Sequence, residues 1–360
     1  TLYYELAIVQ QIVTPFTGVL TGGNFNQESG SAADLWNDYY QNVIKYTRDA
    51  IASLADSPER TNLLNMTRII QAYAFMVLTD TYGDIPYSQG GVGLTQQVTF
   101  PSYDSQESIY TDIISELTAA TAALSASGGD ESGEVLFAGD ITKWKEFGNS
   151  LLLRAGMRLS EVNPSLAQST VAAAFAAGVI SSNDNNAMIL HDSNYGFGIG
   201  NTLNSNESAN FFLVDSFVDY LQGNNDPRLG SIAVKYDGAT NASEQTSDVR
   251  NTNPGDQMGM PMGFDSGGIV GQAAADGLAS FYEYSQADRE RQASFLAPTY
   301  IVTYAQTQLT LAEAALKGWV TGDAETFYNA GVRAHMEQMG MTSADSAIAT
   351  GDIDAYLAAN

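Results

Sequence analysis

Residues 67–88 read TRIIQAYAFMVLTDTYGDIPYS, a helix-like run that ends abruptly in GDIPY. Before Gly83 the apolar side chains recur every three or four residues, which predicts a helix with one face in a core. Gly83 can adopt the positive φ that closes a helix, and Pro86 prevents the helix from resuming. Ile85 and Tyr87 can then pack the loop back onto the helix. We therefore expect GDIPY to be a structural helix stop and not a ligand-binding loop.

Four other regions show the same helical periodicity. Asp104 and Glu107 lie three residues apart, which is the spacing of a capping box at the start of a helix. Asp140 has the position of an N-cap, and Asn163-Pro164 ends the apolar run that follows it. The sequence therefore predicts helices over 31–55, 61–81, 104–125, about 140–163 and, as a pair, about 303–339.

The last helical pair also has the residue offsets of a tetratricopeptide repeat, a unit of about 34 residues made of two antiparallel helices. Such a unit needs small side chains where its helices meet, together with one aromatic residue. These offsets are occupied by Leu311, Ala312, Ala324, Tyr328 and Gly331, and a second set by Ala155, Ala167, Val171 and Ala174. We expect a mainly α fold in which tetratricopeptide-like helix pairs form an irregular scaffold.

The composition changes between about 181 and 299, where glycine, asparagine and methionine gather in stretches such as NYGFGIGN (194–201) and MGMPMGFDSGGIVG (258–271). This composition is typical of loops. One helix is predicted within the region, over 210–222. We expect a single domain over 1–360, with a helical scaffold over about 1–180 and 300–360 and a loop-rich ligand side over about 181–299.

Composition restricts the classes of partner. The 360 residues include 15 Lys and Arg against 41 Asp and Glu, a formal charge of −26, which opposes binding to nucleic acid or to an anionic membrane surface. The chain has no cysteine, so disulfides, thiolate nucleophiles and cysteine-based zinc sites are excluded. A hydrophobic content of 44% is ample for a core, and no apolar run is long enough to span a bilayer.

The sequence offers little for catalysis. Histidine occurs only at His191 and His335, and no serine lies in a GxSxG context. The sequence does not exclude a glycosidase-type pair of carboxylates, because the distance between the two carboxyl groups depends on the three-dimensional structure. The Asn- and Asp-rich turn at 183–186 lacks the spacing of a calcium loop. We expect a protein that is not an enzyme, with no catalytic residues and no cofactor; a structural calcium ion has no supporting motif.

The remaining chemistry is a set of aromatic and amide side chains on the glycine-rich loops. Aromatic faces stack on the C–H patches of neutral sugars while amides bind the hydroxyls, so this mixture suits a glycan, with a peptide as the second choice. The competing interpretation is that the aromatic residues only anchor loops to the scaffold. The candidate ligand residues are Tyr195, Phe197, Asn194, Asn201, Asn204 and Phe264, with His191 as a hydrogen-bond donor.

The opening stretch, with Arg68, Ala72 and GDIPY at fixed spacing, resembles the signature of SusD/RagB-like outer-membrane lipoproteins, in particular the SusD-like subgroup. Other segments look like that family in the same order, and together they cover nearly the whole chain. These are PSYDSQESIYTDIISELTAATAAL (101–124), KWKEFGNSLLLRAGMRLSEVNP (143–164), NNDPRLG (224–230) and YIVTYAQTQLTLAEAALKGWVTGDAETFYNAGVRAHM (300–336).

The resemblance implies a lipid-anchored protein exposed at the outer surface of a Bacteroidetes-type bacterium. Such a protein captures oligosaccharides and delivers them to a SusC-like TonB-dependent transporter. It implies no nucleic-acid partner, and membrane attachment only through an N-terminal lipid; the lipidated cysteine of the family is missing, so we expect a trimmed or incompletely represented chain. A peptide-binding protein of the same architecture, as in RagB-like proteins, and a non-catalytic helical-repeat interaction scaffold are the alternatives.

Overall fold

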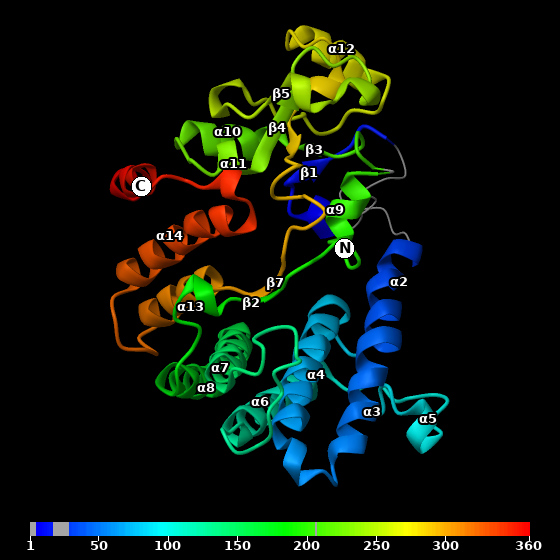
Figure 1. The fold of residues 1–360 in the computed structure, drawn as a ribbon, viewed down its shortest axis with the longest axis vertical. Helices are drawn as coiled ribbons and strands as arrows, with labels where there is room; N and C mark the ends of the chain where they lie inside the picture. The colour runs from blue at the N-terminus through cyan, green and yellow to red at the C-terminus, as the bar shows by residue number, and fades with distance from the viewer. Residues whose placement is uncertain (1–4, 17–28, 206) are drawn as a thin grey trace. The chain divides into compact units, whose positions relative to one another are not determined.

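The computed structural model describes residues 5–16, 29–205 and 207–360, and backbone contacts divide the chain into two compact units (Figure 1). The first, here called the helical unit, consists of Ala33–Ile189 and Tyr300–Ala334. The second, here called the mixed unit, contains the described residues up to Ala32 together with Leu190–Thr299 and His335–Asn360. Each unit is therefore built from separate segments of the sequence.

The predicted helices are present in the helical unit. The region 31–55 forms α2 (Ser29–Asp38) and α3 (Lys45–Leu54), joined by a π-helical segment over Tyr39–Ile44. Downstream of it come α4 (Thr61–Tyr82), the short α5 (Gly93–Gln96), α6 (Gln106–Ala123), α7 (Ile141–Arg158), α8 (Pro164–Ala177), α13 (Tyr304–Leu316) and the first part of α14 (Ala324–Thr342). Two short strands, β2 (Ala187–Ile189) and β7 (Thr299–Val302), pair with each other.

Successive helices of this unit pack against one another, α3 on α4, α4 on α6, α6 on α7 and α7 on α8 (Figure 1). Asp140 caps α7 as predicted, accepting hydrogen bonds from the backbone N–H groups of Thr142 and Lys143. Small residues bring the helices together, since a Cβ on Gly156 of α7 would lie 2.8 Å from Val171 of α8. The predicted contact residues of this pair are buried: Ala155, Ala167, Val171 and Ala174.

Helices α13 and α14, the last predicted pair, also meet through a small residue, but one predicted contact is wrong. A Cβ on Gly331 of α14 would lie 2.8 Å from Leu309 of α13, so a glycine is needed where these helices meet. The prediction that Tyr328 supplies the packed aromatic residue is wrong, because its side chain is 53% exposed. The neighbouring Phe327 packs instead, edge-on against Phe175 of α8 with ring centroids 6.2 Å apart.

GDIPY is a structural helix stop, as the sequence predicts. Gly83 follows α4 with a φ of +76°, a region that favours glycine. Ile85 is fully buried in the core, and the Tyr87 ring packs edge-on against Phe75 of α4 with centroids 4.6 Å apart. The Tyr40 hydroxyl donates to the Pro86 carbonyl oxygen at 2.8 Å, which ties the loop to the π-helical segment.

The capping box predicted from Asp104 and Glu107 is wrong. Ser105 is the N-cap of α6, and its side chain accepts from the Ser108 N–H. The Asp104 carboxylate binds the GDIPY loop, accepting from the backbone N–H of Tyr87 at 3.0 Å and of Ser88 at 2.8 Å. In return, Asp84 of the loop accepts from the Gln106 N–H at the start of α6 at 2.9 Å. The GDIPY loop and the start of α6 therefore accept hydrogen bonds from each other's backbone N–H groups. Local sequence spacing does not reveal such contacts between distant residues.

The mixed unit contains short elements. These are α1 (Glu5–Ile8), β1 (Ile12–Val13), α9 (Gly198–Leu203), β3 (Phe212–Leu213), α10 (Asp215–Gly223), α11 (Leu229–Ile232), β4 (Ala233–Tyr236), β5 (Arg250–Asn251), α12 (Gly268–Ala275), β6 (Gln286–Ala287) and α15 (Thr350–Ala359). β4 lies between β5 and β6, with both neighbours antiparallel to it. β1 pairs with β3 in the register Ile12 opposite Leu213 and Val13 opposite Phe212.

Three sequence predictions for this region need correction. The helix predicted over 210–222 begins only at Asp215, because Phe212 and Leu213 form the strand that pairs with β1. The glycine-rich stretch 194–201 contains the start of α9, and the stretch 258–271 contains the start of α12. Glycine lowers helix propensity, but it does not prevent a short helix that packing supports.

Candidate functional site

The candidate ligand residues of 191–204 lie on a loop of the mixed unit and on helix α9, which follows it, and a local turn fixes the loop. The Asp192 side chain accepts hydrogen bonds from the backbone N–H groups of Asn194 and Tyr195, each at 2.8 Å. The main chains of Asp192 and Tyr195 also exchange two hydrogen bonds of 3.2 Å. An Asp side chain that bonds its own backbone two or three residues on is a common turn device. It holds Tyr195 at the surface, where the side chain is 69% exposed.

Three aromatic rings gather at this turn. The rings of His191 and Tyr195 are stacked, with centroids 5.6 Å apart and planes 24° apart. The Phe197 ring lies on His191 with centroids 5.7 Å apart and planes tilted by 40°. We call His191, Tyr195 and Phe197 the aromatic platform. The structure thus brings together three of the residues that the sequence singled out.

Both ring nitrogens of His191 have partners. Nδ1 lies 3.0 Å from the Tyr195 carbonyl oxygen, and Nε2 lies 2.8 Å from the Thr299 hydroxyl. Because a carbonyl oxygen can only accept, Nδ1 carries the hydrogen, and in the neutral ring Nε2 accepts from Thr299. These two bonds hold the His191 ring against Tyr195. They also occupy both ring nitrogens, so the predicted hydrogen bond from His191 to a ligand would have to replace one of them.

Glycines let the neighbouring segment support the platform closely. A Cβ on Gly196 would lie 2.2 Å from the Phe295 ring, and one on Gly200 would lie 2.3 Å from the Ser294 carbonyl oxygen. The Phe197 N–H donates to the Phe295 carbonyl oxygen at 2.8 Å. Phe295 is itself partly exposed and belongs to the site, although sequence reasoning missed it. Its sequence neighbourhood has no signal that distinguishes it from a buried anchor.

The predicted amides differ in their surroundings. Asn194 is exposed in the turn beside Tyr195, and Asn201 is exposed on α9. The Asn204 amide nitrogen donates to the backbone carbonyl oxygens of Gly200, Arg289 and Ala293, so it holds α9 in place. Phe264 precedes α12 and lies beside its first residue, since a Cβ on Gly268 would be 3.4 Å from the Phe264 ring, and the ring contacts of the platform do not include it.

His335 belongs to a different cluster within the mixed unit. Its Nδ1 lies 3.1 Å from Nη1 of Arg228, whose guanidinium forms an ion pair with the buried Asp226. Burial and the nearby Arg228 charge lower the pKa of His335 to about 4, in spite of Asp226. His335 is a partly buried residue whose ring contact is structural.

Two general features bear on the kind of site. Within the described residues, no group of three or more His, Asp or Glu side chains is arranged to hold a metal ion. The expectation that the protein has no cofactor stays a prediction. Among the helices that the structure describes, none is both long and apolar enough to cross a membrane.

Comparison with known proteins gives the family. A family model described as "Starch-binding associating with outer membrane", SusD-like, matches residues 4–360. A solved structure of a chitin-binding protein has a TM-score of 0.84 and 30% identity, over 100% of this chain and 74% of that chain. A Bacteroidetes SusD-like protein, AC2a, has a TM-score of 0.82 and 26% identity, over 100% and 77%.

A chitin-binding SusD homologue from Flavobacterium johnsoniae shares the fold, with a TM-score of 0.73 and 23% identity over 96% of this chain and 65% of that chain. The comparison with curated proteins finds no match. The family model and the 30% identical structure agree with the mainly α architecture that the sequence predicts. The chain belongs to the SusD-like family.

Proposed function

We propose that the protein binds neutral glycans on the aromatic platform. The observation that carries this proposal is the stacked pair of His191 and Tyr195, with the Tyr195 ring 69% exposed beside Phe197. When a sugar stacks on an exposed aromatic ring, its C–H face replaces the water on that ring. The Asp192 turn already fixes the position of Tyr195, so little ordering is needed on binding. The exposed amides of Asn194 and Asn201 supply hydrogen bonds for sugar hydroxyls or acetamido groups.

The first glycans to test are oligomers of N-acetylglucosamine. The 30% identical relative is named as a chitin-binding protein, and the family description names starch. A β-linked N-acetylglucosamine unit offers a flat face of axial C–H bonds for an aromatic ring and an acetamido carbonyl for an amide donor. Starch oligosaccharides form the second arm of the panel, and cationic peptides form the third, because the formal charge of −26 favours them if glycans fail.

Calorimetry with this panel tests the proposal. Tyr195→Ala removes the exposed ring and is expected to weaken glycan binding about 5- to 30-fold, the equivalent of about 1–2 kcal/mol for one aromatic contact. Tyr220→Ala is the matched control, since Tyr220 is 65% exposed on α10 of the same unit and lies outside the platform. Equal affinity in both variants, or binding of peptides alone, contradicts the proposal.

We further propose that the bound glycan is delivered to a SusC-like TonB-dependent transporter and that the protein acts at the cell surface of the outer membrane, held by an N-terminal lipid. Family membership and the family's association with the outer membrane support this role. The protein binds and delivers its ligand without cleaving it. Co-purification of the transporter with the tagged protein from solubilised outer membranes, and unchanged oligomer length after long incubation with the glycan, are the expected results.

A further inference from the structure

The helical unit contains a groove of about 490 Å³ that the proposed glycan site does not use. Helices α6, α7 and α8 line it, and α7 packs against both of the others. The volume lies within the roughly 300–1,000 Å³ of small-molecule sites. A Cβ on Gly148 of α7 would lie 2.2 Å from the Thr121 hydroxyl oxygen of α6, so close helix packing fixes the shape of the groove. Its apolar residues are Ile114, Ala122, Leu152, Ala173, Ala174 and Ala177.

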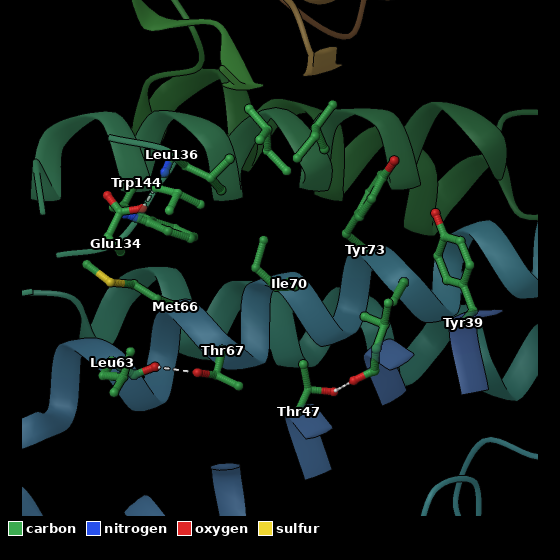
Figure 2. A pocket seen from close by; sticks show the side chains of 15 residues that line it. Tyr39, Thr47, Leu63, Met66, Thr67, Ile70, Tyr73, Glu134, Leu136 and Trp144 are labelled. Atoms are coloured by element: carbon green, nitrogen blue, oxygen red, sulfur yellow. Dashed lines mark hydrogen bonds between the residues drawn. The ribbon is translucent and has the colours of Figure 1, made fainter. Parts of the chain in front are cut away.

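A cavity along α4 in the same unit has a different character. Its walls are mostly apolar, and the Ile70 side chain points into the middle (Figure 2). The threonine hydroxyls on these walls donate to their own backbone, as Thr67 does to the Leu63 carbonyl oxygen at 2.8 Å. Such walls do not select a particular ligand, whereas the groove on α7 carries polar groups that are free.

The charge of the groove is opposite to that of the chain. Lys145 is the one charged residue among the described residues that line it, although the chain has 41 Asp and Glu against 15 Lys and Arg. Lys145 forms no ion pair within the part of the chain that the structure describes. The adjacent Glu146 accepts from the side chains of Ser181 and Asn185 at 3.3 and 2.7 Å. An ammonium group without a counter-ion, in a groove without carboxylates, favours an anionic ligand group.

Two buried polar side chains of the groove each have an oxygen without a partner. Asn149 is only 5% exposed, and its amide nitrogen donates to the Gly178 carbonyl oxygen at 2.7 Å. That bond orients the amide, and no donor among the described residues binds its Oδ1. Thr170 is 7% exposed, and its hydroxyl has no partner in the described ranges either. Both residues line the groove, and neither oxygen is sealed from it. Buried polar groups are nearly always bonded, so these two indicate a ligand with a hydrogen-bond donor.

We propose that this groove binds the carboxyl end of a peptide, with the terminal carboxylate on Lys145 Nζ and a backbone N–H donating to Asn149 Oδ1. Lys145 and Asn149 lie one turn apart on the same face of α7, and a peptide presents a carboxylate and an amide at a comparable spacing. The apolar walls take an aliphatic last side chain. A neutral sugar has no group for Lys145, and an acidic sugar would place its hydroxyls against apolar walls at a cost.

Calorimetry with the full chain at about 0.15 M salt tests this proposal, because the field of distant carboxylates is screened beyond about 8 Å under these conditions. The probes are N-acetyl-Ala-Ala-Leu with a free carboxylate and the same peptide as a C-terminal amide. The acid is expected to bind at least about tenfold more tightly than the amide, which is the contribution of one charged hydrogen bond.

Two further probes distinguish the source of the carboxylate. The C-terminal amide of N-acetyl-Asp-Ala-Leu carries it on a side chain, and N-acetylneuraminic acid carries a carboxylate and an amide on a sugar. Both are expected to bind more weakly than the free acid of N-acetyl-Ala-Ala-Leu, because neither places a carboxylate, an amide N–H and an aliphatic side chain at the end of a chain. Tighter binding of either one overturns the proposal.

Lys145→Gln separates the charge from the shape of the groove. It keeps a long polar side chain and removes the ammonium group, so it is expected to lower the affinity of the acid to that of the amide. Lys45→Gln is the matched control, because Lys45 is also half-buried, lies on α3 of the same unit over the Tyr46 ring, and is not part of the groove. Both variants change the net charge of the chain equally.

Ala173→Trp fills the groove from α8, where Ala173 is exposed, and is expected to weaken binding of the acid at least about tenfold. Ala176→Trp adds the same indole at an exposed position of the same helix outside the groove and is the control. A melting curve for each variant confirms that it is folded.

Three other results overturn the proposal: no binding of the acid, equal affinity for the acid and the amide, or equal effects of Lys145→Gln and Lys45→Gln. None of these measurements involves a glycan or the aromatic platform, so this proposal and the proposed function fail separately.

Discussion

Arg48 fixes the end of the GDIPY loop by donating from Nη2 to the Tyr87 carbonyl oxygen at 2.7 Å. Its Nε donates to the Gly90 carbonyl oxygen at 3.2 Å, and its guanidinium lies over the Phe75 ring, 5.3 Å from the centroid. Burial lowers the pKa of Arg48, with nearby Tyr87 and acidic residues opposing the shift. The planar Arg48 side chain therefore holds the loop that follows α4 and also packs on Phe75 of α4.

Lysine cannot replace this arginine, because an ammonium group has neither the forked donors nor the planar face. Arg48→Lys is expected to lower the free energy of unfolding by about 1–3 kcal/mol through the lost charged hydrogen bonds. Chemical denaturation followed by circular dichroism measures this change. Arg158→Lys is the control, since Arg158 is half exposed beside Asp80 and its pair contributes about 1 kcal/mol or less. Equal effects in the two variants contradict the role of Arg48.

Gly196→Ala is expected to disturb the aromatic platform. The added Cβ would lie 2.2 Å from the Phe295 ring, so either the loop or Phe295 must move, at a cost of about 1–3 kcal/mol in stability and with weaker glycan binding. Gly198→Ala is the control on the same loop, because its Cβ meets no atom within 4 Å and alanine favours the start of α9. A melting curve and a glycan titration are measured for both variants. Equal stability and equal glycan affinity in the two variants contradict the close packing of Gly196 against Phe295.

Asp288→Asn is expected to destabilise the mixed unit strongly. The Asp288 side chain is fully buried and forms ion pairs with Arg250 and Arg291, so neutralising it removes the counter-ion of the buried Arg291 and leaves Arg250 with only its 3.5 Å pair to Glu290. Removing one partner of a buried ion pair costs about 3–5 kcal/mol. Asp237→Asn, whose side chain is 53% exposed beside Lys235, is expected to cost about 1 kcal/mol or less. Urea denaturation of both variants gives the comparison.

His335 makes stability depend on pH in a defined window. Its folded pKa of about 4 lies below the ordinary value of 6.5, so the unfolded chain binds a proton between these pH values and the folded chain does not. The stability that neutral His335 contributes is therefore complete above about pH 6.5 and is lost as the pH falls toward 4. The groups that face the ring are Arg228 and Asp226, and Arg228 also lies over the Tyr356 ring.

His335→Gln keeps an acceptor for Arg228 and removes the titration. Wild type and variant are measured by urea denaturation from pH 7.5 to 4. The wild type is expected to lose stability relative to the variant below about pH 6.5, with a difference in slope that approaches one proton bound on unfolding. Parallel curves over this range contradict the assignment, whereas carboxylates elsewhere titrate equally in both proteins and cancel.

The sequence predicts the helical unit well because its signals are local. The periodicity before Gly83, the N-cap at Asp140 and the small residues Ala155 and Ala167 each act within one helix or between neighbouring helices. The mixed unit depends on pairings between distant residues, such as Ile12 with Leu213, that no local pattern reveals. For the same reason the helix predicted over 210–222 extends too far toward its N-terminus.

The candidate site shows the same division. Residue chemistry identified His191, Tyr195 and Phe197, and the structure places their rings together. The contribution of Phe295 comes from a segment nearly 100 residues away that is brought close by Gly196, and the use of the Asn204 amide for three backbone carbonyls is equally non-local. Side-chain type predicts which residues can bind a ligand, and the fold decides which of them are available.

The pairing of β1 with β3 has a consequence for the order in which the protein can fold during synthesis. Val13 must wait for Phe212 to leave the ribosome, and the helical unit must wait for α13, which begins at Tyr304. Contacts between such distant positions require the closure of long loops, which slows folding. The β1–β3 pairing and the packing of α13 on the helical unit therefore form only after the long segments between their partners have been synthesised, and until then the emerged part of each unit lacks contacts of its final core.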